Sequence, residues 1–176
     1  MNFQKIPPVD RNSGDVHVII DTPKGNRNKF SWSEKWQLFE MSGVLPAGAV
    51  FPYDFGFIPQ TRGGDGDPLD VLVLMDEPGT VGCLVRTRLL GVIEAEQTEE
   101  GNTARNDRLI GVAVKSRTDG DYKTLEDLSK ALIDEIEHFF VSYNAAKGKK
   151  FKPLGRYGPE RARRLVKQST RAKRKL

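Results

Sequence analysis

The apolar residues of the chain fall into short runs in its first two thirds and into a helical pattern after that. The run from Val16 to Ile20 is rich in β-branched residues and precedes Asp21-Thr22-Pro23, which predicts a strand that ends in a turn. Residues 71–75 are apolar throughout, as expected for a buried strand. The expected strands cover residues 16–20, 50–58, 71–75, 82–93 and 109–115, with a polar loop at 94–108.

The clearest helical pattern runs from Thr124 to about Ala146, where apolar residues recur at spacings of three and four. Thr124 and Asp127 fit a capping box, and Gly148 follows as a stop signal. A second, shorter helix is expected to start at Pro159-Glu160. The order of elements predicts an α+β fold that is mainly β, a small five-stranded OB-like β-barrel with both helices packed outside.

The 176 residues are enough for one domain with its own core, which we place at residues 1–160, followed by a basic C-terminal helix or tail at 161–176. That tail holds eight of the 28 basic residues and no acid, so the remaining 20 basic and 24 acidic residues give the body a net charge of −4. A basic tail can touch nucleic acid non-specifically, but such a run is more often a solvated helix face.

We expect no association with a membrane, because no apolar run approaches the roughly 20 residues that span a bilayer. The N-terminal residues lack the apolar stretch of a secretory signal, and the single cysteine, Cys83, cannot form an intrachain disulfide. These features predict a cytoplasmic protein.

The segment from Asp65 to Asp70 carries the most specific chemistry, because it places three carboxylates within six residues directly before the apolar strand. Their mutual repulsion is relieved by a cation, and Gly66 and Pro68 restrict the backbone between them. Magnesium prefers a few carboxylates plus water and phosphate oxygens. The alternative is an acidic turn that caps a strand. The apolar strand excludes an EF-hand calcium loop, because it occupies the positions of the later ligands.

This segment resembles the signature of the family I soluble inorganic pyrophosphatases. Residues 23–29, residues 55–61 and His138-Phe139-Phe140 before Tyr143 are similar to family segments in the same order. The resemblance implies magnesium-dependent hydrolysis of pyrophosphate to two phosphates by a metal-bridged water, with several Mg²⁺ ions and Mn²⁺ as an alternative. It also implies a homo-oligomer, often a hexamer among bacterial relatives.

By position, the resemblance makes Asp67 the general base and Asp65 and Asp70 ligands of the metal ions. Lys29, Arg108 and Tyr143 match groups that bind phosphate. The loop after Ile93 normally supplies two more aspartates. Here Arg108 fits the position of a lysine, so Asn106 falls at the second aspartate with Asp107 beside it, and Gln97 falls near the first, beside Glu96. A loop one residue longer brings Asp107 or Glu96 toward the metal, and we take Asp107 as a predicted ligand.

Other family positions have changed: Ser31 replaces a glutamate, Gly43 an arginine, Phe55 a tyrosine and Asn144 a lysine, while Lys147 lies one turn further on. These changes thin the contacts to phosphate and predict reduced activity, unless Arg62, Arg105 or Arg108 replaces them. Two alternatives follow: hydrolysis of another diphosphate compound, and a catalytically reduced pyrophosphatase-like binding protein that uses its basic tail for nucleic acid or a partner.

Overall fold

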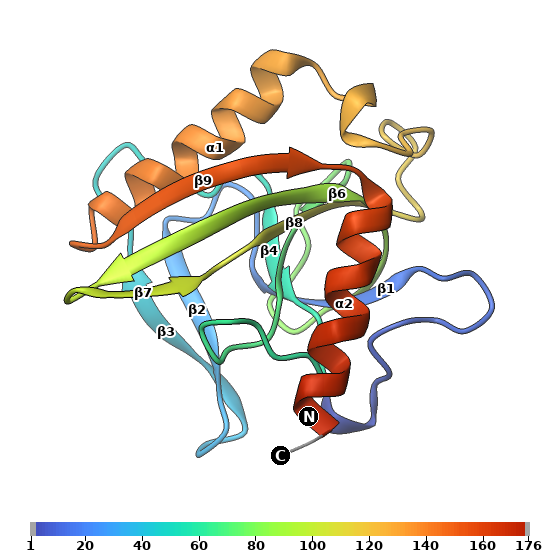
Figure 1. Cartoon of the computed structure of the whole chain (residues 1–176), viewed down its shortest axis with the longest axis horizontal. Helices are drawn as coiled ribbons and strands as arrows, with labels where there is room; N and C mark the ends of the chain where they lie inside the picture. Colours follow the sequence, from blue (N-terminus) through green and yellow to red (C-terminus); the bar gives the residue numbers. More distant parts are fainter. Residues whose placement is uncertain (1–2, 175–176) are drawn as a thin grey trace.

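Five strands of the protein close into a ring. A computed structural model describes residues 3–174, with the backbone alone for Gln4 and residues 171–174. Around the ring follow β1 (Val16–Thr22), β4 (Asp54–Phe57), β5 (Asp70–Leu74), β8 (Arg108–Ala113) and β6 (Leu84–Glu99), and β6 pairs again with β1 (Figure 1). All neighbours are antiparallel except β5 and β8, which are parallel. The predicted mainly-β, five-stranded OB-like architecture is confirmed.

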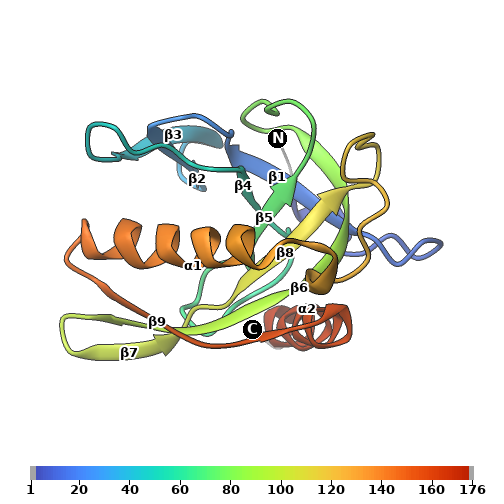
Figure 2. The same cartoon turned by 90° about the horizontal axis from the view of Figure 1, so that it is seen from above.

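Strand β5 is buried on both faces, which explains its continuous apolar sequence. Successive side chains of a strand point to opposite sides. The two valines of β5 belong to one buried cluster together with Val166 of α2 (Pro159–Arg174), whereas its two leucines belong to a second cluster with Phe140 of α1 (Lys130–Ala145). Helix α2 packs against β6, and α1 runs beside β9 (Lys150–Tyr157; Figures 1 and 2).

The long helix begins later than the sequence predicts. The expected capping box of Thr124 and Asp127 is present, but it caps the short 3-10 turn η2 (Leu125–Asp127). Leu128 is extended, and a second cap at Ser129 starts α1, with its Oγ accepting a hydrogen bond from the backbone N–H of Leu132 at 3.2 Å. The prediction of one helix from Thr124 was therefore wrong at its start, because two caps five residues apart divide the segment. The helix predicted at Pro159 is confirmed in its start, but it has 16 residues like α1 and is therefore not the shorter of the two.

The expected polar loop at residues 94–108 was also wrong. Strand β6 continues to Glu99 and turns back into β7 (Asn102–Arg105), with Glu100 and Gly101 both at positive φ, as in the tight turns that join two strands. Much of this hairpin is polar on both faces, so no alternation of apolar and polar residues marks it in the sequence.

A second hairpin was not predicted at all. Strands β2 (Asn28–Ser33) and β3 (Leu38–Val44) form a separate two-stranded sheet beside the ring, where β2 contacts β1 (Figure 2). Every residue of β2 is half-buried and most of β3 is exposed, so neither strand carries the pattern of a core strand. Strand β9, which pairs with β6, was likewise missed. The β2–β3 hairpin matters for function, because it forms one wall of the site described below.

As far as residue 174, the basic C-terminal stretch belongs to α2, which packs against β6, and residues 175–176 lie outside the described part of the chain. Ala162 and Val166 are buried, Arg161 forms an ion pair with the carboxylate of Glu94, and Arg163 pairs with Glu160 at 2.8 Å. The boundary between residues 160 and 161 stays a prediction. Among residues 3–174, no helix has the length and apolar character needed to cross a membrane.

Candidate active site

The three aspartates of the acidic segment lie on the turn that leads into β5. Leu69 is buried, and its backbone N–H donates to the Thr61 hydroxyl at 3.0 Å, which anchors the turn to the core. Gly66 has φ +93°, a value that favours glycine, and the N–H of Gly63 donates to the carbonyl of Asp67 at 2.7 Å. The turn is thus held at both ends and leaves the aspartate side chains to face the pocket side of the ring.

The carboxylates of this turn repel one another, which is the condition for a cation site. Burial raises the pKa of Asp65 above its ordinary value, and the charges of Asp70 and Asp67 raise it further. This rise in the pKa of Asp65 is partly offset by the hydrogen bond that its carboxylate accepts from the backbone N–H of Asp67 at 3.2 Å. A divalent cation beside Asp65 would stabilise its ionised form, which burial and repulsion disfavour.

The register of the two parallel strands brings Arg108 to Asp70. These residues are direct partners at the starts of β8 and β5, and the guanidinium of Arg108 forms an ion pair with the Asp70 carboxylate. The same nitrogen donates to Oδ1 of Asn106. The Arg108 side chain is only 6% exposed and is packed by the rings of Phe140, Phe151 and Phe55, whose centroids lie 5.2, 5.7 and 6.0 Å from its central carbon. Arg108 is therefore a fixed cation at the base of the pocket.

A second cation, Lys29, reaches the pocket from β2. Its ammonium donates to Asp21 of β1 at 2.7 Å and lies 4.4 Å from the ring centroid of Phe55. Burial raises the pKa of Asp21 to about 6, and the charge of Lys29 opposes this shift. Phe55, which stands at a tyrosine position of the resemblance, thus binds the lysine through its ring and offers no hydroxyl.

Tyr143 of α1 faces the same pocket, and Lys147, one turn further along, donates to its hydroxyl. Burial raises the pKa of Tyr143, so the hydroxyl keeps its proton. Asn144, which stands at the lysine position, is buried and turned back into the helix, where its amide donates to the carbonyl of Phe140 at 2.8 Å. Lys147 rather than residue 144 therefore supplies positive charge beside Tyr143.

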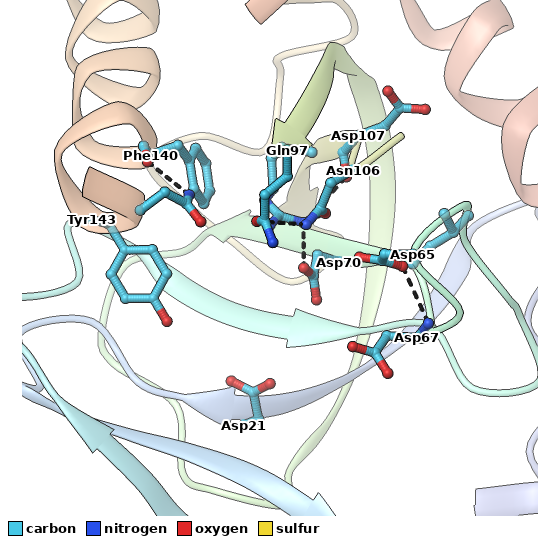
Figure 3. A network of polar contacts seen from close by, with 12 residues as sticks. Asp21, Asp65, Asp67, Asp70, Gln97, Asn106, Asp107, Phe140 and Tyr143 are labelled. Carbon is cyan, nitrogen blue, oxygen red and sulfur yellow. Dashed lines mark hydrogen bonds and ion pairs between the residues drawn. The ribbon is translucent and has the colours of Figure 1, made fainter. Parts of the chain in front are cut away.

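The loop register left open by the sequence is resolved by the β6–β7 hairpin. Gln97 and Asn106 face the site: the Asn106 side-chain amide donates to the Gln97 carbonyl oxygen at 3.0 Å, beside Asp70 (Figure 3). Asp107 points away from the aspartate turn (Figure 3). Its carboxylate accepts hydrogen bonds from Arg105 at 2.7 Å and from the backbone N–H of Ala95 at 3.0 Å. Arg105 also pairs with Glu94 at 2.8 Å, so neither Asp107 nor Arg105 joins the group around Asp70.

One pocket of about 390 Å³ connects most of the predicted residues. Its lining includes Asp67, Asp70, Lys29, Arg108 and Tyr143, which come from the aspartate turn, β2, β8 and α1. Asp65 lies on the adjoining turn, and Asp107 lies outside. The lining also contains Phe3, Trp32 and Phe57, which the sequence reasoning missed. Only recognition of β2 as a strand could have directed attention to Trp32.

The donor set fits a weakly enclosed, hydrated divalent ion better than a complete protein cage. Within residues 3–174, no three acidic, histidine or cysteine side chains converge as ligands of one ion. Magnesium commonly takes one or two carboxylates and completes its shell with water and phosphate oxygens. Asp65, Asp67 and Asp70, which share a turn and repel one another, provide that kind of set.

Comparisons with known proteins agree with this geometry. The family model described as inorganic pyrophosphatase matches residues 18–174. An inorganic pyrophosphatase of Nostoc is 32% identical over 172 residues, covering 98% of this chain and 99% of the relative, and one of Synechocystis is 34% identical over 155 residues, covering 88% and 89%. The crystal structure of the inorganic pyrophosphatase from Thermus thermophilus superposes with a TM-score of 0.89 at 30% identity and covers 99% of each chain. The chain belongs to the inorganic pyrophosphatase family.

Proposed function

We propose that the protein hydrolyses inorganic pyrophosphate to two phosphates with the help of Mg²⁺. The observation that carries the proposal is the shared pocket, in which carboxylates of the aspartate turn face the cations Lys29 and Arg108 and the hydroxyl of Tyr143. Carboxylates suit a metal ion and a water molecule, and the two cations and the tyrosine hydroxyl suit phosphate oxygens. Relatives that match nearly the whole chain carry the name of this activity.

Each residue has a role that its position supports. Asp65 and the Asp70 oxygen that is not paired with Arg108 would hold the metal, and Asp67 would accept the proton of the attacking water. A bound divalent cation lowers the pKa of its water and offsets the charge of phosphate. Lys29, Arg108 and Tyr143 hold phosphate oxygens by charge-assisted and neutral hydrogen bonds. Asp107 has little support as a ligand, because Arg105 and the N–H of Ala95 already occupy its carboxylate. We propose several Mg²⁺ ions at saturation, with Mn²⁺ able to substitute.

We expect this protein to hydrolyse pyrophosphate more slowly than other members of its family. Neutral Gln97 and Asn106 face the aspartate turn, and Arg108 already neutralises Asp70, so fewer carboxylates are free for metal. Ser31 and Gly43 offer no charge to substrate, and Phe55 offers no hydroxyl. Interactions lost in the transition state reduce kcat/KM.

The test is phosphate release from pyrophosphate with magnesium, measured for the wild type and Asp67→Asn. Loss of a general base should reduce the rate by about 100-fold or more. Asp121→Asn, at an exposed site away from the pocket, is the matched control and should keep the wild-type rate. Equal rates for wild type and Asp67→Asn would reject the proposed mechanism.

The ion pair between Arg108 and Asp70 favours a second candidate, a protein that binds diphosphate compounds with little turnover. The two candidates differ in one measurement. Tight binding of a non-hydrolysable pyrophosphate analogue without phosphate release from pyrophosphate would support the binding protein. Binding accompanied by Asp67-dependent release would support the enzyme.

We also propose a cytoplasmic homo-oligomer, with hexamers as the expected form. Exposed apolar side chains support a subunit contact on β3, where Leu38, Met41 and Val44 are 65, 60 and 54% exposed. Light scattering of the purified protein, compared with Leu38→Glu, tests it. A monomeric wild type, or a variant that assembles equally well, would contradict an oligomer built on this face.

A further inference from the structure

Packed aromatic rings contribute one wall of the pocket. Phe3 of η1 (Phe3–Lys5), Trp32 of β2, Phe39 of β3 and Phe57 of β4 form this aromatic wall, and all four are half-buried. Ring centroids lie 4.5 Å apart for Phe3 and Trp32, 5.3 Å for Trp32 and Phe39, and 5.8 Å for Phe3 and Phe57. The first helix turn and three strands thus meet in one apolar surface.

The aromatic wall and the phosphate-binding cations line the same cavity. Phe3, Trp32 and Phe57 share it with Lys29, Arg108 and the two carboxylates of Asp67 and Asp70. Its volume of about 390 Å³ lies in the range of pockets that hold organic ligands. A charged end and an aromatic end in one cavity form a polarised site, which suits a compound with both a diphosphate and a ring.

Between Lys29 and Trp32, β2 presents a small residue to the pocket. Of the two intervening residues, Ser31 belongs to the lining and Phe30 does not. The Ser31 hydroxyl is turned to Ser42, with 2.8 Å between the two oxygens. Gly43, the partner of Lys29 on β3, has no side chain, and a Cβ there would meet only the Cβ of Lys29 at 4.0 Å. Along β2, a ligand that is held by Lys29 can therefore extend past Ser31 toward Trp32.

We propose that this pocket accepts organic diphosphates, with an aromatic ring of the ligand, such as a nucleobase, stacked on the aromatic wall. The inference rests on the proposed function, because the same residues hold the diphosphate. Hydrolysis of such a compound adds one water across the P–O–P bond: a P–O bond breaks, and the products are inorganic phosphate, an organic monophosphate and a proton released to solvent. Base stacking on an aromatic side chain contributes about 5- to 150-fold in affinity.

The test compares two non-hydrolysable probes that share a P–C–P unit, methylenediphosphonate and adenosine α,β-methylenediphosphate. Their dissociation constants are measured by calorimetry on the full-length protein with magnesium. The wild type should bind the adenosine compound at least about fivefold more tightly. Trp32→Ala should bring the ratio of the two constants close to one, and Trp32→Phe, which keeps a ring, should retain most of it. Trp36→Ala is the matched control, because Trp36 is 59% exposed on the same hairpin and outside the pocket lining, and it should leave the ratio unchanged.

The outcomes separate the inference from the function on which it rests. If the wild type binds both probes equally, or if Trp32→Ala keeps the wild-type ratio, the aromatic wall does not select ligands and the inference fails while the diphosphate site stands. If neither probe binds, the diphosphate site itself fails and the inference with it. Circular dichroism of Trp32→Ala and Trp32→Phe shows whether each variant is folded. If Trp32→Ala is unfolded, Trp32→Leu, which keeps apolar volume without a ring, takes its place: a ratio near one supports the inference, and the wild-type ratio overturns it.

Discussion

Replacing Arg108 by methionine gives a sharp test of the buried ion pair in the site. Methionine preserves much of the aliphatic volume among the rings of Phe140 and Phe151, but it leaves the Asp70 carboxylate without a counter-ion and Oδ1 of Asn106 without a donor. Removing one member of a buried ion pair typically costs about 3–5 kcal/mol. Asp70 is 25% exposed, so water offsets part of this loss, and we expect Arg108→Met to destabilise the fold by about 2–3 kcal/mol.

The assay is urea unfolding followed by circular dichroism in a chelating buffer. With a urea dependence of about 1–3 kcal/mol per molar, the expected loss lowers the midpoint by about 0.7–3 M. The double variant Arg108→Met with Asp70→Asn removes the unpaired charge and should recover at least half of the loss. Magnesium should stabilise Arg108→Met more than the wild type, because the single variant frees the Asp70 carboxylate for the ion. A cost below about 0.5 kcal/mol, or no recovery in the double variant, would refute the ion pair as a buried structural contact.

Further expectations concern pH, packing and substrate affinity. Because burial raises the pKa of Asp21 from its ordinary 3.8 to about 6, the folded state binds this proton more tightly than the unfolded state does. The stability that the proton contributes below pH 3.8 is therefore lost as the pH rises to about 6. Asp21→Asn should remove up to about 3 kcal/mol of this decline, measured by unfolding at a series of pH values, and an unchanged slope of stability against pH would contradict it. Gly56→Ala should cost about 3 kcal/mol or more in thermal unfolding, because its Cβ would lie 2.3 Å from the carbonyl oxygen of Ile19, whereas Gly43→Ala should change stability by less than about 0.5 kcal/mol. Tyr143→Phe should raise KM for pyrophosphate about 5- to 10-fold through the loss of one hydrogen bond, and an unchanged KM would place the hydroxyl outside the substrate contacts.

Local patterns were sufficient to predict the elements that are buried. The continuous apolar run of β5 and the β-branched run of β1 predict buried strands, and both are mostly buried strands of the ring. The hairpins β2–β3 and β6–β7 are polar or half-exposed, so their hydrogen-bonded partners rather than their own side chains define them. The start of α1 was misplaced because the capping box at Thr124 is real but serves a shorter turn.

The site shows the same division between local and long-range information. The grouping of Asp65, Asp67 and Asp70 could be predicted, since they share one turn. The choice between Asn106 and Asp107 could not, because it depends on the register of β7 and β8 against β6. The aromatic wall was invisible for a similar reason: Phe3, Trp32 and Phe57 are far apart in sequence, and tertiary structure alone brings them together.

Because β5 and β8 are paired in parallel from their starts, the positions of the site residues on these strands do not depend on the length of the hairpin between β6 and β8. Asp70 and Arg108 are fixed as neighbours by the strand starts, whereas Glu100 and Gly101 form an exposed tip beyond them. Residues added at that tip extend the hairpin outward and leave the strand starts in place. Gly101 is therefore a suitable point for grafting a reporter peptide or an affinity tag into the interior of the chain.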